Sequence, residues 1–376
     1  MRDKCTSYCL AVVSIWLAAV SICACSGSSS VPVAGDASTD TDTNADTDSD
    51  SGTDAGTDTD PTGCWWEQME SGMESGTEIH IGTVWGLSEF EVYAIYYNTD
   101  SGDSGVLRFD GSSWNIEWSF TSHNVISIWG FSSESIFLSL YDIESSLGEV
   151  QFYDGSTWSE VSGYSGGGGR LWGSSENDLY LRSGWRIWHY NGSDWAVAWE
   201  ETLGGEDEWS ASIYAIWGSA SDDVFGVGVQ HEPYSPYSGN YIIHYDGTEF
   251  TGMFDSYCCT CLIDVFGVSA SAVYAVGNAE EFLDEGVNMS TVLEYDGDVW
   301  SQIGEFDYRG LRGVWANEDG EVFAVGQNVV LHYKDGVWEE MVIPVPVSLT
   351  DIWGTDIDNL YAVGLYGVIL KYTCAE

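Results

Sequence analysis

Two short motifs recur along the chain from residue 64 onward, and no other feature restricts the possible folds as strongly. The first motif is an apolar residue followed by an aromatic residue and a small one, usually Trp-Gly. Its aromatic residues are Trp85, Trp129, Trp172, Trp217, Phe266, Trp315 and Trp353. A run of β-branched and aromatic residues begins seven positions after each of them. Successive anchors are 44, 43, 45, 49, 49 and 38 residues apart, so the repeat is about 45 residues long.

The second motif is an aromatic residue, then Asp-Gly or Asn-Gly, then another aromatic residue shortly after. It reads FDGSSW at 109–114, YDGSTW at 153–158, YNGSDW at 190–195, YDGTEF at 245–250, YDGDVW at 295–300 and, shortened, YKDGVW at 333–338. Such turns between β-rich runs are typical of hairpins, so each repeat has four short strands. Four strands per repeat of this length make a β-propeller blade, which buries its faces only by stacking in a ring. The sequence therefore predicts an all-β fold, a seven-bladed β-propeller over residues 64–376.

The two ends of the repeat region complement each other. The last repeat stops at its third strand, at Cys374. Residues 64–69 (CWWEQM) match residues 336–341 (GVWEEM), which hold the fourth strand of the preceding repeat. We therefore expect the N-terminal strand to close the last blade. Because this alignment places Cys64 and Cys374 at the same turn, we predict a disulfide between them, which an exported setting permits.

Repeats that read WG, DVYAVG and HYDGxxW resemble those of exported propeller lipoproteins that are abundant in myxobacteria. The turn with Gly-x-x-Trp also resembles the Asp-box of sialidase-like propellers. The sequence departs from the Asp-box, since Asp110, Asp154, Asp246 and Asp296 directly precede the glycine instead of standing two residues before it. The resemblance covers residues 64–376 and implies the fold more strongly than any activity.

The first 24 residues have the pattern of an export signal peptide. Arg2 and Lys4 precede an apolar run, residues 10–22, that is short for a membrane span. The junction at residues 22–25 (ICAC) resembles the bacterial lipobox, which implies lipidation of Cys25; ordinary cleavage nearby is the alternative. Ser26 resembles the residue that sends lipoproteins to the outer membrane. These patterns predict an exported protein at the outer membrane or cell surface, attached to the membrane through its lipid alone.

Residues 25–63 are predicted to form a disordered tether rich in Asp, Thr and Ser. The segment has nine Asp residues and neither an aromatic nor a basic residue, so it has nothing to bury. Asp46, Asp48 and Asp50 have the spacing of a calcium loop, but Ser51 and Thr57 stand where an EF-hand has Gly and Glu. No cofactor is predicted, and calcium remains an alternative.

The chain has a formal net charge of −50. The predicted propeller alone holds 50 acidic and eight basic residues, so most of this charge belongs to the folded ring. Such a surface cannot replace the counterions of nucleic acid or of an anionic membrane, and both are excluded as partners. We expect a soluble and monomeric propeller whose surface repels other acidic bodies.

Loop lengths distinguish the two faces of the predicted ring, whose strands we label a to d from the axis outward. On one face, the turn face, the a–b offset is always seven residues and the c–d turn varies by one. On the other, the loop face, the b–c loops and the d-to-a connections between blades vary. The distance from the b-strand aromatic to the c-strand aromatic is 16, 16, 10, 20, 21, 10 and 11 residues. Variable loops on a rigid scaffold usually carry function, so we expect the loop face to bind.

The candidate binding residues are the aromatic and acidic side chains of segments 96–105, 142–148, 200–212, 230–240 and 278–289. This combination suits a sugar, a peptide or a calcium ion. The residues are Tyr96, Tyr97, Asp103, Trp209, Tyr234, Tyr237, Glu280, Glu281 and Asp284. The alternative is that these loops only keep the protein soluble.

No catalytic residue is predicted. His189, His244 and His332 occupy the same strand position in three repeats, and such recurrence indicates a structural role. A sialidase-like site would need an arginine triad, yet the arginines do not fall at equivalent inner positions; only Arg170 and Arg312 directly precede inner strands. The chain has no Gly-x-Ser-x-Gly or His-Glu-x-x-His motif.

Three cysteines, Cys258, Cys259 and Cys261, stand in one connection between blades. A local disulfide, attachment to a partner and a metal are all open, although a lone C-C-x-C without a nearby His is no zinc pattern. The sequence as a whole predicts a surface-tethered, non-catalytic binding or scaffold module for a protein or glycan. The alternative is a secreted glycan-active hydrolase, sialidase-like or with paired carboxylates, on the same fold.

Overall fold

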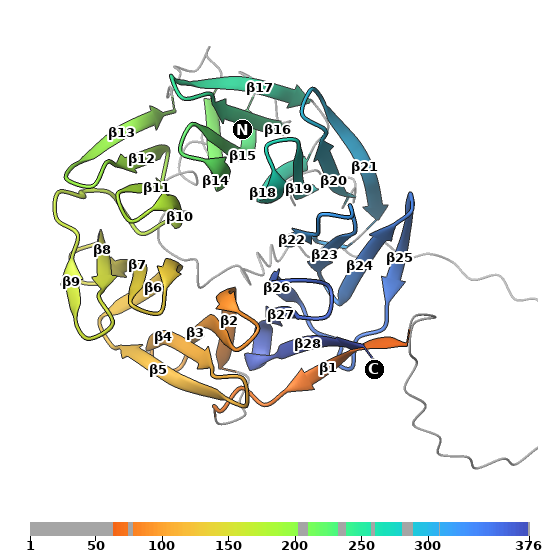
Figure 1. Ribbon diagram of the computed structural model, residues 1–376, viewed down its shortest axis with the longest axis horizontal. Helices are drawn as coiled ribbons and strands as arrows, with labels where there is room; N and C mark the ends of the chain where they lie inside the picture. Colours follow the sequence, from red (N-terminus) through yellow and green to blue (C-terminus); the bar gives the residue numbers. More distant parts are fainter. Residues whose placement is uncertain are drawn as a thin grey trace, which may run out of the picture. The chain divides into compact units, whose positions relative to one another are not determined.

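The computed structural model describes residues 63–73, 78–201, 210–231, 238–256, 260–279, 289–307 and 309–374. The predicted signal peptide, Cys25 and the tether up to residue 62 lie outside these residues. The described residues form seven four-stranded antiparallel sheets, arranged around a central axis as propeller blades (Figure 1). The prediction of an all-β, seven-bladed β-propeller is confirmed.

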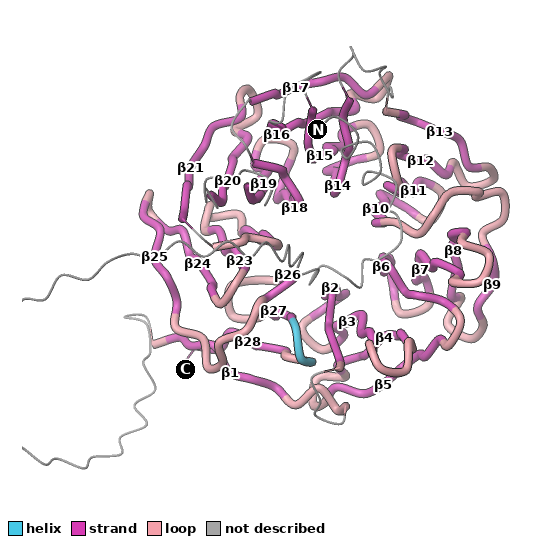
Figure 2. Tube along the Cα trace, turned by 180° about the vertical axis from the view of Figure 1, so that it is seen from behind, coloured by secondary structure: helices cyan, strands magenta, loops and turns pink. Residues whose placement is uncertain are grey.

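Each blade begins with its innermost strand, and the strands are as follows. Blade 1 has β2 (Ile79–Ser88), β3 (Glu91–Asn98), β4 (Ser104–Phe109) and β5 (Trp114–Phe120); blade 2 has β6 (His123–Ser132), β7 (Ser135–Asp142), β8 (Leu147–Tyr153) and β9 (Trp158–Glu160). Blade 3 has β10 (Arg170–Ser175), β11 (Asp178–Ser183), β12 (Arg186–Tyr190) and β13 (Trp195–Glu200); blade 4 has β14 (Ser210–Ala220), β15 (Asp223–His231), β16 (Ser238–Tyr245) and β17 (Phe250–Ser256). Blade 5 has β18 (Thr260–Ser269), β19 (Ala272–Ala279), β20 (Met289–Tyr295) and β21 (Trp300–Asp307); blade 6 has β22 (Gly313–Ala316), β23 (Val322–Gly326), β24 (Val329–Lys334) and β25 (Val337–Met341). Blade 7 has β26 (Leu349–Gly354), β27 (Leu360–Gly364), β28 (Ile369–Cys374) and β1 (Cys64–Met69). A short 3-10 turn, η1 (Leu365–Gly367), joins β27 to β28 and is drawn in cyan in Figure 2.

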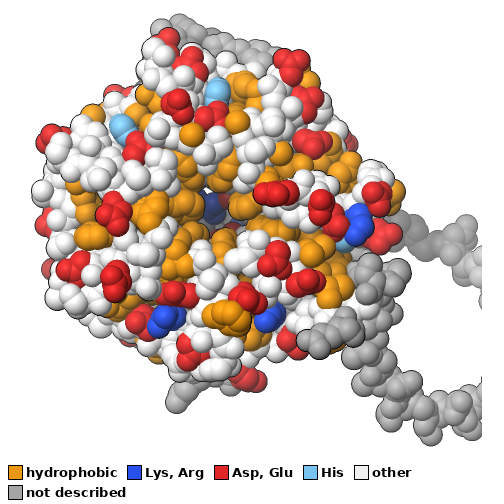
Figure 3. All heavy atoms as spheres, in the orientation of Figure 1, with side chains coloured by type: hydrophobic (Ala, Val, Ile, Leu, Met, Phe, Trp, Pro, Cys, Tyr) orange, Lys and Arg blue, Asp and Glu red, His pale blue; other side chains and the backbone are white. Residues whose placement is uncertain are grey.

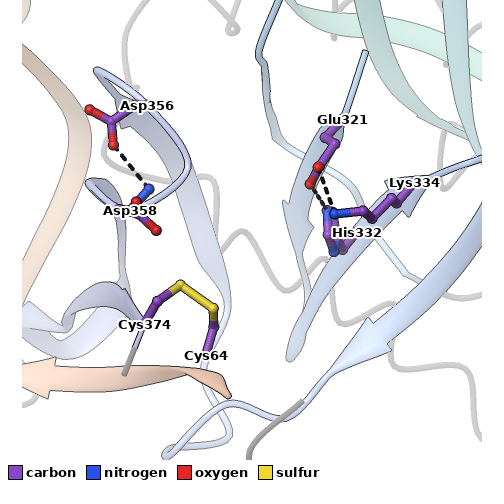
Figure 4. Close-up of a disulfide and its surroundings, with 7 residues drawn as sticks. All are labelled: Cys64, Glu321, His332, Lys334, Asp356, Asp358 and Cys374. Atoms are coloured by element: carbon purple, nitrogen blue, oxygen red, sulfur yellow. Dashed lines mark hydrogen bonds and ion pairs between the residues drawn. A yellow bond between two sulfur atoms is a disulfide. The ribbon is translucent and has the colours of Figure 1, made fainter. Parts of the chain in front are cut away.

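Blade 7 joins the two ends of the ring, as predicted. Strand β1 pairs antiparallel with β28, in a register that runs from Cys64 opposite Cys374 to Met69 opposite Ile369. A disulfide links Cys64 to Cys374, the pairing that the sequence predicts (Figure 4). The bond stands on the turn face, where the other blades have a c–d hairpin turn, and replaces that turn with a covalent link.

The Trp-Gly motif is explained by contacts between blades. In blades 1, 2, 4 and 5 the inner tryptophan of the preceding blade lies so close to the glycine that a side chain there would collide with its ring. In blades 3 and 7 the preceding tryptophan instead donates its indole N–H to the glycine carbonyl, from Trp129 at 3.0 Å and from Trp315 at 2.9 Å. A Cβ atom at Gly86 would lie 2.6 Å from Trp353, and one at Gly267 would lie 2.4 Å from Trp217. The motif therefore repeats because each blade supplies a ring to one neighbour and a gap to the other.

Blade 5 departs from this rule, and blade 6 compensates for the departure. Phe266 replaces the inner tryptophan of blade 5, and Ala316 replaces the glycine that follows in blade 6. Both residues belong to the apolar cluster between the two blades, where Ala316 is buried. The smaller ring leaves room for one methyl group, so the two exceptions to the motif match in size.

The Asp-Gly motif forms the c–d turns. In blade 2 the Asp154 carboxylate accepts hydrogen bonds from the backbone N–H groups of Ser156 and Thr157, at 2.9 and 2.8 Å. Gly155 has a φ of 86°, a left-handed conformation that favours glycine. In the shortened turn of blade 6, Asp335 and Gly336 have φ angles of 52° and 83°, as a two-residue turn between twisted strands requires.

The inner strands differ in length, and this difference shapes the loop face. In blades 1, 2, 4 and 5, which we call the long blades, the a strands have 10 or 11 residues. In blades 3, 6 and 7, the short blades, the a strands have 6, 4 and 6 residues. The a–b turns keep a constant offset, so the extra residues of the long blades extend the ring on the loop face.

Candidate functional site

Charged side chains meet at the axis of the ring. They occupy the position directly before the apolar residue of the first motif, where the seven repeats have Thr83, Ser127, Arg170, Ala215, Asp264, Gly313 and Asp351. The Arg170 guanidinium donates a hydrogen bond through Nη1 to Asp264 Oδ1, at 2.5 Å. These two residues come from blades 3 and 5, so their contact spans the inner side of blade 4. We call Arg170, Asp264 and Asp351 the axial cluster.

The axial acids also fasten neighbouring blades together. Asp264 Oδ2 accepts a hydrogen bond, at 3.1 Å, from the backbone N–H of Val314, which lies in the inner strand of the next blade. Asp351 Oδ2 accepts the equivalent bond from Val84 at 3.0 Å, across the junction between blades 7 and 1. Ser127 Oγ does the same for Leu171 at 3.0 Å. The same position thus serves a blade-to-blade contact whether it holds a hydroxyl or a carboxylate.

Burial shifts the titration of the axial acids. Burial and the nearby charge of Asp264 raise the pKa of Asp351 to about 7. Burial also raises the pKa of Asp264, although its ion pair with Arg170 acts in the opposite direction. Burial acts to lower the pKa of Arg170, but the two acids outweigh it and the pKa is raised. The cluster therefore combines a charged guanidinium with a carboxyl group that titrates near neutral pH.

A second guanidinium lies beside the cluster. Arg182 stands directly opposite Arg170 in the pairing of β10 with β11. Its Nε donates a hydrogen bond to the backbone carbonyl of Ile213, and its Cζ lies 5.5 Å from the centre of the Tyr214 ring. Burial, with the positive charge of Arg170, lowers the pKa of Arg182 to about 10. Two like charges thus face each other in blade 3.

The three histidines of the c strands hold their own blades together. His189, His244 and His332 pair through Nε2 with Asp178, Asp223 and Glu321, at 2.6, 2.6 and 2.8 Å. Each imidazole also stacks on the b-strand aromatic ring, at centroid distances of 4.4, 4.4 and 4.2 Å. Figure 4 includes the blade 6 example, where Lys334 joins the same glutamate. In blade 1 Arg108 takes this place, 3.3 Å from Glu91.

The predicted binding residues differ in where the structure places them. Tyr96 is 4% exposed and packs in the core, with its hydroxyl 2.8 Å from Ser119 Oγ, so its assignment to the binding face is corrected. The correction arises because β3 continues to Asn98, which turns this side chain into the blade interior. Tyr97 is half-buried at the end of β3, and Asp103 lies in the turn before β4. Trp209, Tyr234, Tyr237, Glu280, Glu281 and Asp284 lie outside the described residues.

The loop face exposes apolar side chains that sequence reasoning did not select. Ile143, in the b–c loop of blade 2, and Leu147, the first residue of β8, are 48% and 57% exposed, and Trp185, in the b–c loop of blade 3, is 36% exposed. Tyr366, in η1 of blade 7, is 55% exposed and has a φ of 60°, a strained conformation for an aromatic residue. All four are large apolar residues outside the two motifs, which is the sequence signal that could have identified them.

The cysteine cluster is only partly described. Cys261 is buried in β18, whereas Cys258 and Cys259 lie outside the described residues, so their pairing stays open. Within the described ranges, no group of three or more His, Cys, Asp or Glu side chains is arranged to hold a metal ion. Nor do those ranges contain a helix with the length and apolar character needed to cross a membrane.

Comparisons with known proteins support the fold. No family model matches the chain, and no curated protein matches it either. Among solved structures, YCF48 bound to a D1 peptide is similar with a TM-score of 0.58 and 13% identity, over 84% of this chain and 98% of that one. The GH74 xyloglucanase from Xanthomonas campestris has a TM-score of 0.54 and 12% identity, over 81% of this chain and 53% of that one.

A third similar structure is the propeller domain of the Trilobed protease from Pyrococcus furiosus. It has a TM-score of 0.51 and 10% identity, over 76% of this chain and 91% of that one. That domain is described as having an open velcro topology, whereas blade 7 here is closed by β1 and a disulfide. At these identities the likeness shows the fold alone. The chain is a β-propeller similar to binding, glycoside hydrolase and peptidase propellers.

Proposed function

We propose that this protein is an exported lipoprotein that acts as a non-catalytic binding module through the loop face of its propeller. The lipid on Cys25 and the acidic tether would hold the ring away from an outer membrane or cell surface. The ligand would be a protein or a glycan, and the propeller would act as a monomer.

The contrast between the two faces carries this proposal. The turn face is uniform, because the Trp-Gly contacts and Asx-Gly turns serve packing in nearly every blade. The loop face varies among the blades in loop and strand length, and it exposes Ile143, Leu147, Trp185 and Tyr366. Exposed apolar side chains on the variable face of a rigid scaffold are typical of a binding surface.

The negative net charge of the propeller supports a ligand whose own net charge is zero or positive. Acidic side chains are scattered over the face of the ring shown in Figure 3, between uncharged and hydrophobic ones, and basic side chains are few there. The predicted propeller region has 50 acidic and eight basic residues. Long-range repulsion from such a surface slows the approach of polyanions and favours basic partners.

The decisive experiment exposes the full-length protein to glycan and peptide arrays and then assays each hit for turnover. Binding without turnover is the expected result, and release of product would contradict the proposal. Trp185→Ser and Tyr366→Asn should weaken binding; asparagine suits the left-handed backbone at residue 366. Phe90→Ser is the matched control, because Phe90 is 60% exposed but lies on the turn face.

One observation favours the alternative, a glycan-active hydrolase. Paired carboxylates beside an arginine are a common catalytic arrangement, and the axial cluster has these groups. Both acids, however, already accept backbone hydrogen bonds from the neighbouring blade, and each side chain is only 9% or less exposed. If the hydrolase alternative were right, Asp351→Asn would abolish a measurable glycan turnover while Asp356→Asn, in an exposed turn, would not.

The membrane anchor has a separate test. Replacing Cys25 by serine should move the protein from the membrane fraction to the soluble exported fraction. Retention of C25S in the membrane fraction would contradict the lipid anchor, and would leave the binding experiment unaffected.

A further inference from the structure

Arg182 lacks the acidic partner that most basic side chains of the described residues have; Lys371 also lacks one and lies instead over the Tyr361 ring. Five other basic side chains of the described residues pair with an acidic group within 4 Å, and these are Arg108, Arg170, Arg186, Arg309 and Lys334. No acidic group pairs with Arg182 in the described part of the chain. Only its Nε donates a hydrogen bond, to the carbonyl of Ile213. The two terminal nitrogens of the guanidinium are therefore left for another acceptor.

The surroundings of Arg182 add to this charge imbalance. Arg170 stands opposite it in the sheet, and the carboxylate that neutralises Arg170 belongs to blade 5. The Tyr214 ring of β14 lies beside the guanidinium, 5.5 Å from its Cζ. Arg182 is half-buried, so its positive charge is only partly screened by water, and an anionic ligand would supply the missing counter-charge.

The fold leaves the Arg182 side chain accessible from the loop face. Arg182 is the penultimate residue of β11, at its loop-face end, and blade 3 is one of the short blades. Four glycines, residues 166–169, occupy the place where a long blade continues its inner strand. Gly167 is held against β11 by hydrogen bonds with Ser183 Oγ, at 2.9 and 2.8 Å. Arg182 is partly exposed, and basic side-chain atoms are visible within the central opening in Figure 3.

We propose that Arg182, with Arg170 and the ring of Tyr214, forms a binding site for one carboxylate group of a small ligand at the loop-face mouth of the axis. A guanidinium presents two parallel N–H donors that match a carboxylate. The acidic ring disfavours ligands with several negative charges, because each added charge is repelled, and so a monocarboxylate is favoured over a phosphate ester or a sulfated sugar. The Tyr214 ring would contact the ligand's carbon skeleton. This site deepens the proposed function, since it lies on the same face.

The carboxylate could belong to an amino acid or to an acidic sugar, and two pairs of probes distinguish these sources. N-acetylphenylalanine is compared with its amide, and methyl glucuronide with methyl glucoside, by calorimetry on the full-length protein. We expect one of the two acids to bind at least tenfold more tightly than its neutral counterpart. Equal binding of acid and neutral probe, or no binding of either acid, would overturn the proposal.

Variants then assign the effect to Arg182. Arg182→Met should weaken binding of the acidic probe at least tenfold and leave the neutral probe unchanged. Arg186→Gln is the matched control, because Arg186 lies in the same blade but pairs with Glu200 at the surface, and it should bind like wild type. If R182M fails to fold, R182K is the second variant. It keeps the positive charge but lacks the two parallel N–H donors of the guanidinium, and it should bind the acidic probe several-fold less well than wild type. Wild-type affinity in R182K or R182M would contradict the assignment.

The outcome can be separated from that of the proposed function. If the array ligand of the loop face binds R182M and wild type equally, and the acidic probes do not bind, this carboxylate site is wrong while the binding module stands. If neither the arrays nor the probes give a hit, both proposals fail.

Discussion

The turn face and the loop face of this propeller follow different rules. On the turn face, blade after blade repeats the same contacts: an inner ring against a glycine, an Asx-Gly turn, and in several blades a charged or imidazole side chain against a b-strand ring. On the loop face, strand lengths, loop lengths and exposed side chains change from one blade to the next. Repetition therefore marks residues that hold the ring together, whereas the residues for which we propose a binding role lie outside the repeated motifs.

The largest expected effect comes from removing the disulfide on the turn face. Cys374→Ser leaves β1 held to β28 by hydrogen bonds and packing alone, and it frees the unfolded chain from a loop of 310 residues. We expect the free energy of unfolding to fall by about 2–5 kcal/mol. Denaturant unfolding of wild type and C374S checks this, and the wild-type protein under reducing conditions is the control. Identical unfolding midpoints would contradict it.

Substitutions at the junction of blades 5 and 6 test whether the inner aromatic ring of one blade and the small residue of the next must match in size. Phe266→Trp should overpack Ala316 and destabilise the protein by about 1–3 kcal/mol. Ala316→Gly alone should also destabilise, because it leaves a small void and a freer backbone. The double variant restores the motif of the other blades and should recover most of the stability lost in F266W. A purely additive loss in the double variant would show that the two exceptions are unrelated.

The axial cluster should make stability depend on pH. A carboxyl group whose pKa is raised by folding, as that of Asp351 is to about 7, favours the folded state most at low pH. Its contribution is lost as the pH rises from about 4, the ordinary value, toward 7. Between pH 5 and 7.5, wild type should therefore lose about 2–3 kcal/mol more of its unfolding free energy than Asp351→Asn. Parallel pH profiles for wild type and D351N would contradict the shift, and Asp356→Asn serves as the control.

The smallest effects are expected for the recurrent histidines. Replacing one of them by Phe keeps the stacking but removes the partner of the acid; blade 2 already has Phe152 there, 4.7 Å from Phe137. His189→Phe, His244→Phe and His332→Phe should each cost about 1 kcal/mol. The three losses should add in the triple variant, because the sites lie in separate blades. If one variant alone lost ligand binding or turnover at unchanged stability, the structural interpretation of that histidine would be wrong.

Sequence reasoning was most successful where the chain repeats. The offset of seven residues predicted the a–b hairpins, and the match of residues 64–69 to residues 336–341 predicted the closing strand. The exceptions to the repeat were harder to interpret. Asp264 and Asp351 precede two of the anchors and could have been noticed as charged residues at an inner position. The contact of Asp264 with Arg170 joins blades that are far apart in the sequence, so only the closed ring brings these residues together.

The loop face was less accessible to prediction, for physical reasons. The segment 96–105 is predicted to bind because the b–c connection varies in length, yet β3 continues to Asn98 and turns the Tyr96 side chain inward. Arg182 gave no signal, since its importance comes from an absent acid rather than from a motif. Trp185 and Tyr366 are single residues in short loops, and a single sequence offers no repeat against which to judge them.

The covalent closure of blade 7 has a mechanical consequence. Any force on the chain before Cys64 enters the ring at the first residue of β1. Without the disulfide, that force would peel β1 from β28 pair by pair, beginning at the pair of Cys64 and Cys374. With the disulfide, the load passes through a sulfur–sulfur bond into β28 before any hydrogen bond is stretched. A pull on the chain at Cys64 can therefore be borne without separation of β1 from β28.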